Sequence, residues 1–232
     1  MTEALYLKDS YLKEFEATVI KVEGKLIVLN QTAFYPTSGG QPHDTGIIIA
    51  DKEYRVVDVR KKEGDIVHYV DSDGLKEGIK IKGVIDWERR YKHMRMHTSA
   101  HVISKVIYDA IGALCSGNEI SQDETRMDFS VPISREQFEV FAKSANDVLA
   151  KDLLLKAQFL PREEAMKIPE VCRLFGTTVP NIPVLRILSI GDFDTEADGG
   201  THVKSTKEVG QIVISGYENK GKERKRIYWK LS

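Results

Sequence analysis

Two histidine-containing segments, about a hundred residues apart, constrain this chain more than any other feature. In the first, His97 and His101 are four residues apart within a stretch whose pattern predicts a helix. A four-residue step returns to nearly the same helix face, so both imidazoles can reach one ion. In the second, Asp198 and His202 are also four apart and enclose two glycines, which permit a tight turn. Together the segments offer four ligands, as a tetrahedral zinc site uses, or three plus water.

The composition indicates a globular protein without a strong global charge. The chain has 232 residues, a hydrophobic fraction of 41% and a formal net charge of -1, which suits one large domain or two modest ones. Contact with nucleic acid would therefore need local basic patches. The two cysteines, Cys115 and Cys172, form no CxxC pair, and the N-terminus lacks the order of a signal peptide. Since no apolar run reaches membrane-spanning length, we expect a cytoplasmic protein.

Residues 1–87 carry the pattern of a small β domain. Short runs rich in valine and isoleucine alternate with turns, which predicts a small barrel or sandwich. The expected strands are residues 17–22, 25–29, 46–50, 54–59, 65–69 and 79–85.

A long loop, residues 32–46, interrupts this domain and is rich in glycine and hydroxyl groups. One interpretation is a surface turn between strands, the common outcome for such a composition. The other is a loop whose bare backbone approaches a ligand, with Gln41 and Thr32 supplying hydrogen bonds. The residues alone leave both open.

Residues 88–232 predict a second domain of the α+β class, because helices and strands follow one another without regular βαβ alternation. A helical stripe runs from Val102 to Leu114, and His97 and His101 project away from it. A capping box at residues 134–137 opens a second helix. Strands are expected at residues 125–131, 153–160, 184–190, 208–216 and 226–231.

Basic residues gather near both histidine segments and in the last hairpin. A charge run is usually a solvated face, but a phosphate-bearing substrate guided to a metal would need this arrangement. The candidates for RNA contact are Arg89, Arg90, Arg95, Lys204, Lys207, Lys222 and Lys225.

Several motifs follow one another along the chain in the order that they have in the AlaX family, and the chain resembles the medium-length type of this family. AlaX proteins are free-standing relatives of the alanyl-tRNA synthetase editing domain. The matching residues include Phe34-Tyr35-Pro36, Gly39-Gly40-Gln41, Asp86-Trp87-Glu88-Arg89-Arg90, Met96-His97-Thr98-Ser99-Ala100-His101 and Gly199-Gly200-Thr201-His202-Val203. The resemblance covers nearly the whole chain. It implies a translation-factor-like β-barrel domain at residues 1–87, followed by an α+β editing domain at residues 88–232 with an antiparallel sheet and long helices.

The resemblance further implies ATP-independent hydrolysis of seryl-tRNA(Ala) in trans, with glycyl-tRNA(Ala) as a second candidate substrate. It places zinc on His97, His101 and His202, and expects water on the metal as the nucleophile, without assigning a general base. The glycine-rich motif carries over as an aminoacyl-binding set of Thr32, Phe34, Gly39, Gly40 and Gln41. Thr32 is the residue expected to sense the serine hydroxyl. The oligomeric state, monomer or homodimer, stays open.

One departure from the family pattern concerns Asp198, where the family has cysteine. A carboxylate is a harder ligand than a thiolate, but it also binds zinc, at about 2.0–2.2 Å. Asp198 either ligates the ion, orients a water beside three histidines, or marks an impaired site. Three rival functions therefore remain: a non-catalytic tRNA-binding protein, a deacylase of another mischarged tRNA, and a generic metallohydrolase.

Overall fold

The computed structural model describes residues 1–129, 131–169, 171–173, 179, 181–221 and 224–232. They form two compact units, Met1–Lys92 and His93–Ser232. The division falls inside the long helix α1 (Trp87–Ile111), whereas the sequence predicted a boundary between residues 87 and 88, at its start. The first turn of α1 belongs to the first unit because the side chain of Arg90 forms an ion pair with Asp44 there.

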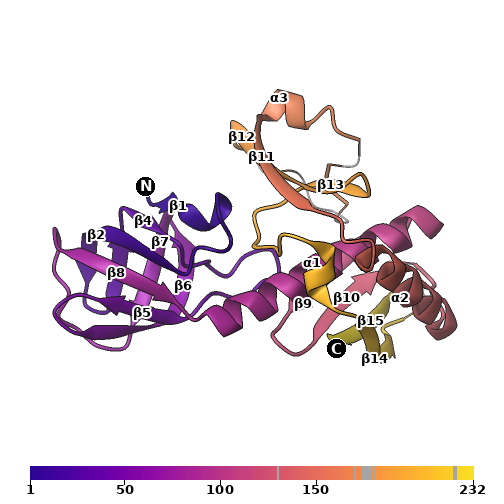
Figure 1. Cartoon of the computed structure of the whole chain (residues 1–232), viewed down its shortest axis with the longest axis horizontal. Helices are drawn as coiled ribbons and strands as arrows, with labels where there is room; N and C mark the ends of the chain where they lie inside the picture. Colours follow the sequence, from indigo (N-terminus) through magenta and orange to yellow (C-terminus); the bar gives the residue numbers. More distant parts are fainter. Residues whose placement is uncertain (130, 170, 174–178, 180, 222–223) are drawn as a thin grey trace. The chain divides into compact units, whose positions relative to one another are not determined.

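The first unit contains a closed β-barrel (Figure 1). Its six antiparallel strands have the order β2-β3-β7-β6-β5-β8. The strands are β2 (Glu14–Glu23), β3 (Leu26–Leu29), β5 (Gly46–Ile49), β6 (Glu53–Lys62), β7 (Asp65–Val70) and β8 (Lys80–Ile85). The short strands β1 (Glu3–Ala4) and β4 (Gln31–Thr32) pair in parallel, and a 3-10 turn, η1 (Leu5–Leu7), follows β1. The predicted barrel is confirmed, while its likeness to translation factors stays a prediction.

Alternation along the strands explains why this segment closes into a barrel. In β2, the side chains of Phe15, Ala17 and Val19 are buried, whereas Glu14 and Glu16 are exposed. Successive residues of a strand face opposite sides, so this pattern sends one apolar row inward, and the inward rows of all six strands fill a small barrel.

The second unit combines two antiparallel sheets with helices, which confirms the α+β class. The four-stranded sheet has the order β14-β15-β10-β9, with β9 (Cys115–Ile120), β10 (Thr125–Phe129), β14 (Ile212–Asn219) and β15 (Lys225–Leu231). The three-stranded sheet has the order β11-β12-β13, with β11 (Leu155–Pro161), β12 (Val184–Ile190) and β13 (Asp194–Ala197). The helices besides α1 are α2 (Arg135–Leu149), α3 (Arg162–Ala165) and the 3-10 helix η2 (Thr206–Val209).

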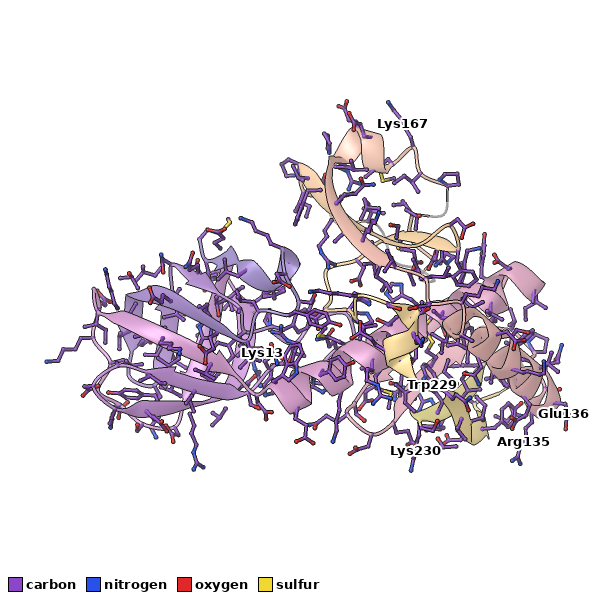
Figure 2. All side chains as sticks on the ribbon, in the orientation of Figure 1. Lys13, Arg135, Glu136, Lys167, Trp229 and Lys230 are labelled. Atoms are coloured by element: carbon purple, nitrogen blue, oxygen red, sulfur yellow. The ribbon has the colours of Figure 1, made fainter. Side chains whose placement is uncertain are left out.

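Local signals in the second unit act as expected. Ser134 and Gln137 form both hydrogen bonds of the capping box that opens α2. On β15, the side chain of Trp229 is fully buried while that of the next residue, Lys230, is exposed; both are labelled in Figure 2. The indole N–H of Trp229 donates to Ser99 Oγ at 2.9 Å, which ties the sheet to α1.

Three details differ from the sequence prediction. Helix α1 ends at Ile111 rather than Leu114, because Gly112 adopts a positive φ of 68° and stops it. Residue Glu208, expected in a strand, lies in η2. The strands β9 and β13 were not anticipated, since their polar sequences lack an apolar alternation. Within the described residues, none of the helices combines the length and apolar character that crossing a bilayer requires.

Candidate metal centre

Helix α1 supplies the first half of the site. Its middle turns are buried on almost every side, from His93 to Ser104, with Arg95 and His101 partly exposed. His97 therefore lies inside the unit although it is off the valine and isoleucine stripe, and only 4% of it is exposed. The four-residue step brings the rings of His97 and His101 to a centroid distance of 5.1 Å, as expected for one helix face.

The segment after β13 supplies the second half, and backbone contacts with β12 hold it in place. The N–H of Asp198 donates to the carbonyl oxygen of Arg186 at 3.1 Å, and the Arg186 guanidinium donates to the carbonyl oxygen of Asp198 at 2.9 Å. Gly200 lies directly against His97: a Cβ there would overlap the imidazole ring. A glycine is therefore needed at this position for close approach of backbone to ligand.

The structure brings together all four predicted ligands, with ligand atoms within 4.8 Å of one another. The three imidazoles direct Nε2 at one carboxylate. His202 Nε2 lies 2.9 Å from Asp198 Oδ2, and the Nε2 atoms of His97 and His101 each lie 3.6 Å from Asp198 Oδ1. Asp198 Oδ2 also accepts the backbone N–H of Gly200 at 2.6 Å. Four donors from α1 and the segment after β13 thus converge on one small volume.

Polar partners on the opposite ring edges orient two of the imidazoles. His101 Nδ1 is 2.8 Å from Glu196 Oε2, and His202 Nδ1 is 3.1 Å from Thr98 Oγ1. A partner that takes up the Nδ1 hydrogen leaves Nε2 with its lone pair, and metal-binding histidines commonly have such an arrangement. The orientation of both rings therefore fits metal ligation through Nε2.

The electrostatics of three of the four groups suit a cation. Burial lowers the pKa of His202 to about 4, and burial with the nearby His202 lowers the pKa of His97 well below 6.5. At His101, burial acts in the same direction, but hydrogen bonds with Asp198 and Glu196 outweigh it and raise the pKa to about 10. Burial opposes ionisation of Asp198, but His97 and His202 overcome it and hold its pKa well below 3.8. A neutral imidazole and an ionised carboxylate are the states that bind metals, so His97, His202 and Asp198 are in the required states. In contrast, His101 must release a proton when an ion binds.

The donor set of three nitrogens and one carboxylate fits a divalent transition metal, and it does not by itself identify zinc. A second group, His101 with Asp194 and Glu196, also has ligand atoms within 4.8 Å. Here the guanidinium of Arg173 already bonds both carboxylates, at 2.6 Å to Asp194 and 3.0 Å to Glu196. Arg173 therefore supplies the positive charge that a second ion would bring.

Glu196, Asp194 and Arg173 were not among the residues predicted from the sequence to form the site. A signal was present for the two acids, because residues 194, 196 and 198 are all acidic and alternate along a strand and its extension. Side chains two apart in a strand share a face. Nothing in the sequence around Arg173 points to this cluster.

The glycine-rich loop belongs to the first unit, and several of its residues are deeply buried. Thr32, Phe34 and Gln41 have no exposed surface, and the hydroxyl of Thr32 lies 2.8 Å from Nε2 of His68. Gly39 and Gly40 form a tight turn with positive φ angles of 57° and 83°, closed by the backbone of Ser38 and Gln41. Because Thr32 is fully buried, contact with a substrate would need this loop to move. The role of Thr32, and that of the whole aminoacyl-binding set, stays a prediction.

The basic residues expected to contact RNA divide into two groups. Arg90 and Lys225 are buried on partners within the protein, whereas the sequence placed them among the candidates for RNA contact. The Arg90 guanidinium binds Asp44 and two carbonyl oxygens, and Lys225 Nζ donates to Asn219 and Gly221. Arg95 is partly buried and donates to the carbonyl oxygen of Val209. The exposed ones are Lys204 and Lys207; Arg89 is half-buried, and Lys222 lies outside the described residues.

Comparisons with known proteins show the family of this chain. Residues 3–89 match a family described as class II (A) tRNA synthetases, and residues 185–228, which include Asp198 and His202, match the second additional domain of threonyl and alanyl tRNA synthetases. The alanyl-tRNA editing protein AlaX-M of Saccharolobus solfataricus is 47% identical over 99% of this chain and 98% of its own length. The chain belongs to the AlaX-M family. The AlaX-M protein of Methanosarcina barkeri is 46% identical over 100% of this chain and 99% of its own.

This chain is also similar to part of a larger enzyme. The alanine–tRNA ligase of Pyrococcus abyssi is 41% identical over 92% of this chain, which corresponds to 24% of the ligase. The matches to the two AlaX-M proteins cover nearly the whole chain, and so they include both segments of the candidate metal site.

Proposed function

We propose that this protein is a trans-editing hydrolase that deacylates tRNA(Ala) mischarged with serine, with glycine as a second candidate. One observation carries the proposal: three imidazoles and a carboxylate converge on one volume in a chain whose full-length relatives are named alanyl-tRNA editing proteins. A pocket sized for alanine discriminates poorly against a smaller amino acid or one with an added hydroxyl, so a second, hydrolytic site is the general solution.

In this proposal His97, His101, His202 and Asp198 hold a zinc ion. A bound zinc ion supplies Lewis-acid chemistry, because it polarises a carbonyl group and lowers the pKa of water. The protein keeps the ligands ready: Glu196 and Thr98 engage Nδ1 of two rings, and the Gly200 N–H fixes one oxygen of Asp198. The exposed Lys204 and Lys207 follow His202 in the chain and are the side chains we assign to phosphate contact.

Deacylation of three charged tRNAs tests the proposal. Purified zinc-loaded protein should release serine from seryl-tRNA(Ala) and leave alanyl-tRNA(Ala) intact, while glycyl-tRNA(Ala) decides the second candidate. His97→Ala should slow serine release by more than about 100-fold, because it removes a ligand and not merely an outer partner. The exposed Glu139→Ala on α2 is the control. A folded, metal-loaded protein that spares seryl-tRNA(Ala) would refute the catalytic assignment.

A second candidate function is tRNA binding without turnover, favoured by the carboxylate of Asp198 at the place where the resembling family has a thiolate. It predicts tRNA binding with metal content well below one per chain. Metal analysis of wild type beside Asp198→Cys and Asp198→Ala separates the two. If Asp198 ligates, Asp198→Ala loses metal, and Asp198→Cys retains it with a preference shifted toward softer ions.

A further inference from the structure

A chain of buried polar contacts extends from His101 away from the metal-site candidate. Glu196 uses one carboxylate oxygen for His101 Nδ1, at 2.8 Å, and the other for the Arg173 guanidinium, at 3.0 Å. The same guanidinium bonds Asp194 at 2.6 Å. The side chains are 2–13% exposed, so water competes little for these bonds. Both oxygens of Glu196 therefore have a fixed partner.

Arg173 is held as firmly as Glu196. Its side chain is 3% exposed, lies between two carboxylates, and has its guanidinium carbon 6.0 Å from the ring centre of Tyr108. A buried guanidinium is stable only with such partners. Because the planar group cannot turn without losing Asp194, it restricts where the Glu196 carboxylate can lie.

We propose that Glu196 is the positioning residue for His101: it accepts the Nδ1 hydrogen so that the Nε2 lone pair faces Asp198 and the cation, and Arg173 holds Glu196 in that position. The inference rests on the proposed metal site and is independent of which aminoacyl-tRNA is hydrolysed. A carboxylate behind a ligating imidazole fixes the ring, selects the tautomer and raises the basicity of the ligand atom.

The hydrogen-bond partner of Nδ1 differs between His202 and His101. The Nδ1 atom of His202 meets the neutral hydroxyl of Thr98, at 3.1 Å, whereas that of His101 meets a carboxylate at 2.8 Å. Hydrogen bonds to an ionised acceptor are shorter and about twice as strong as neutral ones. We therefore expect the loss of Glu196 to affect metal binding more than the loss of the Thr98 hydroxyl.

Two other roles for Glu196 fit the contacts less well. A second metal ion would have to displace the Arg173 guanidinium from both acids. A general base would need an oxygen directed at the reacting atoms, but the oxygens of Glu196 are taken by Arg173 and by His101 Nδ1, on the ring edge opposite Nε2.

The test measures metal affinity in the full-length protein, with Zn²⁺ and Co²⁺ added to metal-free protein in competition with a chelator. Glu196→Leu should weaken binding by roughly 10–100-fold, the usual effect of losing an outer partner. Glu196→Gln should lose less, since its amide oxygen still accepts the Nδ1 hydrogen. Glu119→Gln is the matched control, because it removes another strand glutamate paired with an arginine, Arg126, in the same unit. It should bind metal like wild type.

A second readout separates positioning from general stability. In the zinc-loaded protein, imidazole ¹⁵N NMR should show His101 protonated at Nδ1 in wild type and in Glu196→Gln, with mixed or altered signals in Glu196→Leu. Arg173→Met should weaken zinc binding, and adding it to Glu196→Leu should cause little further loss. A purely structural ion pair predicts the opposite: the double variant would restore zinc affinity.

Several outcomes would overturn the proposal. Folded Glu196→Gln and Glu196→Leu variants with wild-type zinc affinity would do so, as would a wild type that binds neither ion. If Glu196→Leu does not fold, the Gln variant still decides, since a wild-type zinc affinity in that variant would contradict the proposal. Two zinc ions per wild-type chain, with one lost in Glu196→Gln, would make Glu196 a ligand instead. If the Glu196 variants lose zinc affinity as expected but the wild type does not deacylate seryl-tRNA(Ala), the proposed function alone is refuted.

Discussion

Two segments of this molecule contain Gly-Gly, and the glycines serve different purposes. In the barrel unit, Gly39 and Gly40 adopt positive φ angles of 57° and 83° within a tight turn, and a Cβ on Gly39 would meet nothing within 4 Å. In the metal-site segment, neither Gly199 nor Gly200 has a positive φ, but a Cβ on Gly200 would overlap the ring of His97. The first pair is required for backbone conformation, and Gly200 is required for space.

The same two regions each contain a buried histidine bonded to a threonine, again with different consequences. In the barrel, His68 uses Nε2 for the Thr32 hydroxyl at 2.8 Å and Nδ1 for the carbonyl oxygen of Ile27 at 3.2 Å. In the second unit, the hydroxyl of Thr98 lies at Nδ1 of His202, and Nε2 faces Asp198. The ring nitrogens of His68 meet a hydroxyl and a backbone carbonyl oxygen, so this histidine is structural, whereas Nε2 of His202 faces a carboxylate that two further imidazoles also face, a set that can hold a cation.

Substitution at Gly200 should produce the largest effect. Gly200→Ala forces the His97 ring out of position, so we expect metal affinity to fall by at least about 100-fold, more than the loss of an outer partner causes. Chelator competition measures it. Gly199→Ala is the matched control, because a Cβ there meets nothing within 4 Å and no positive φ is involved. Equal metal affinities for the two variants would contradict the distinction between space and conformation.

The histidine comparison predicts a pH effect on the stability of the barrel unit. Burial lowers the pKa of His68 to about 4, against 6.5 in the unfolded chain. Between these values the unfolded state binds the extra proton, so the free energy of unfolding falls as pH falls from 6.5 to 4, by about 3 kcal/mol in total.

His68→Gln removes this titration, while its amide can still accept from Thr32 and donate to Ile27. Urea unfolding of both proteins across this range, with hydrogen exchange of the barrel strands as the local probe, measures the difference. Stability curves that run parallel from pH 6.5 to 4 would show that His68 does not titrate as described.

Substitution at Gly39 should have the smallest effect and should not reach the metal. Gly39→Ala places a Cβ on a left-handed backbone, which costs roughly 1–2 kcal/mol of stability. Gly39→Asn should cost less, since asparagine adopts this conformation more readily. Hydrogen exchange of the barrel strands reports the loss, and zinc affinity should match wild type. If the Asn and Ala variants are equally destabilised, side-chain contact rather than φ would be the cause.

The sequence by itself determined the elements and the ligand types. Alternating apolar residues predicted the barrel strands, and the capping box predicted the start of α2, because such signals act between residues close in the chain. Helical spacing placed His97 and His101 on one face, and the Gly-Gly turn suggested that Asp198 and His202 could point together.

Only the tertiary structure decided which candidate side chains are bound to partners inside the protein. The sequence made Arg90 and Lys225 candidates for RNA contact, yet both are buried and bind partners inside the protein, Arg90 to Asp44 and Lys225 to Asn219. Thr32 reads as a substrate contact, yet its hydroxyl meets His68, a residue 36 positions away. Arg173 carries no motif, and the acidic alternation around Glu196 does not name its partners, because both roles come from contacts between segments far apart in sequence. A residue type and its spacing determine what it can bind, and packing decides which partner it meets.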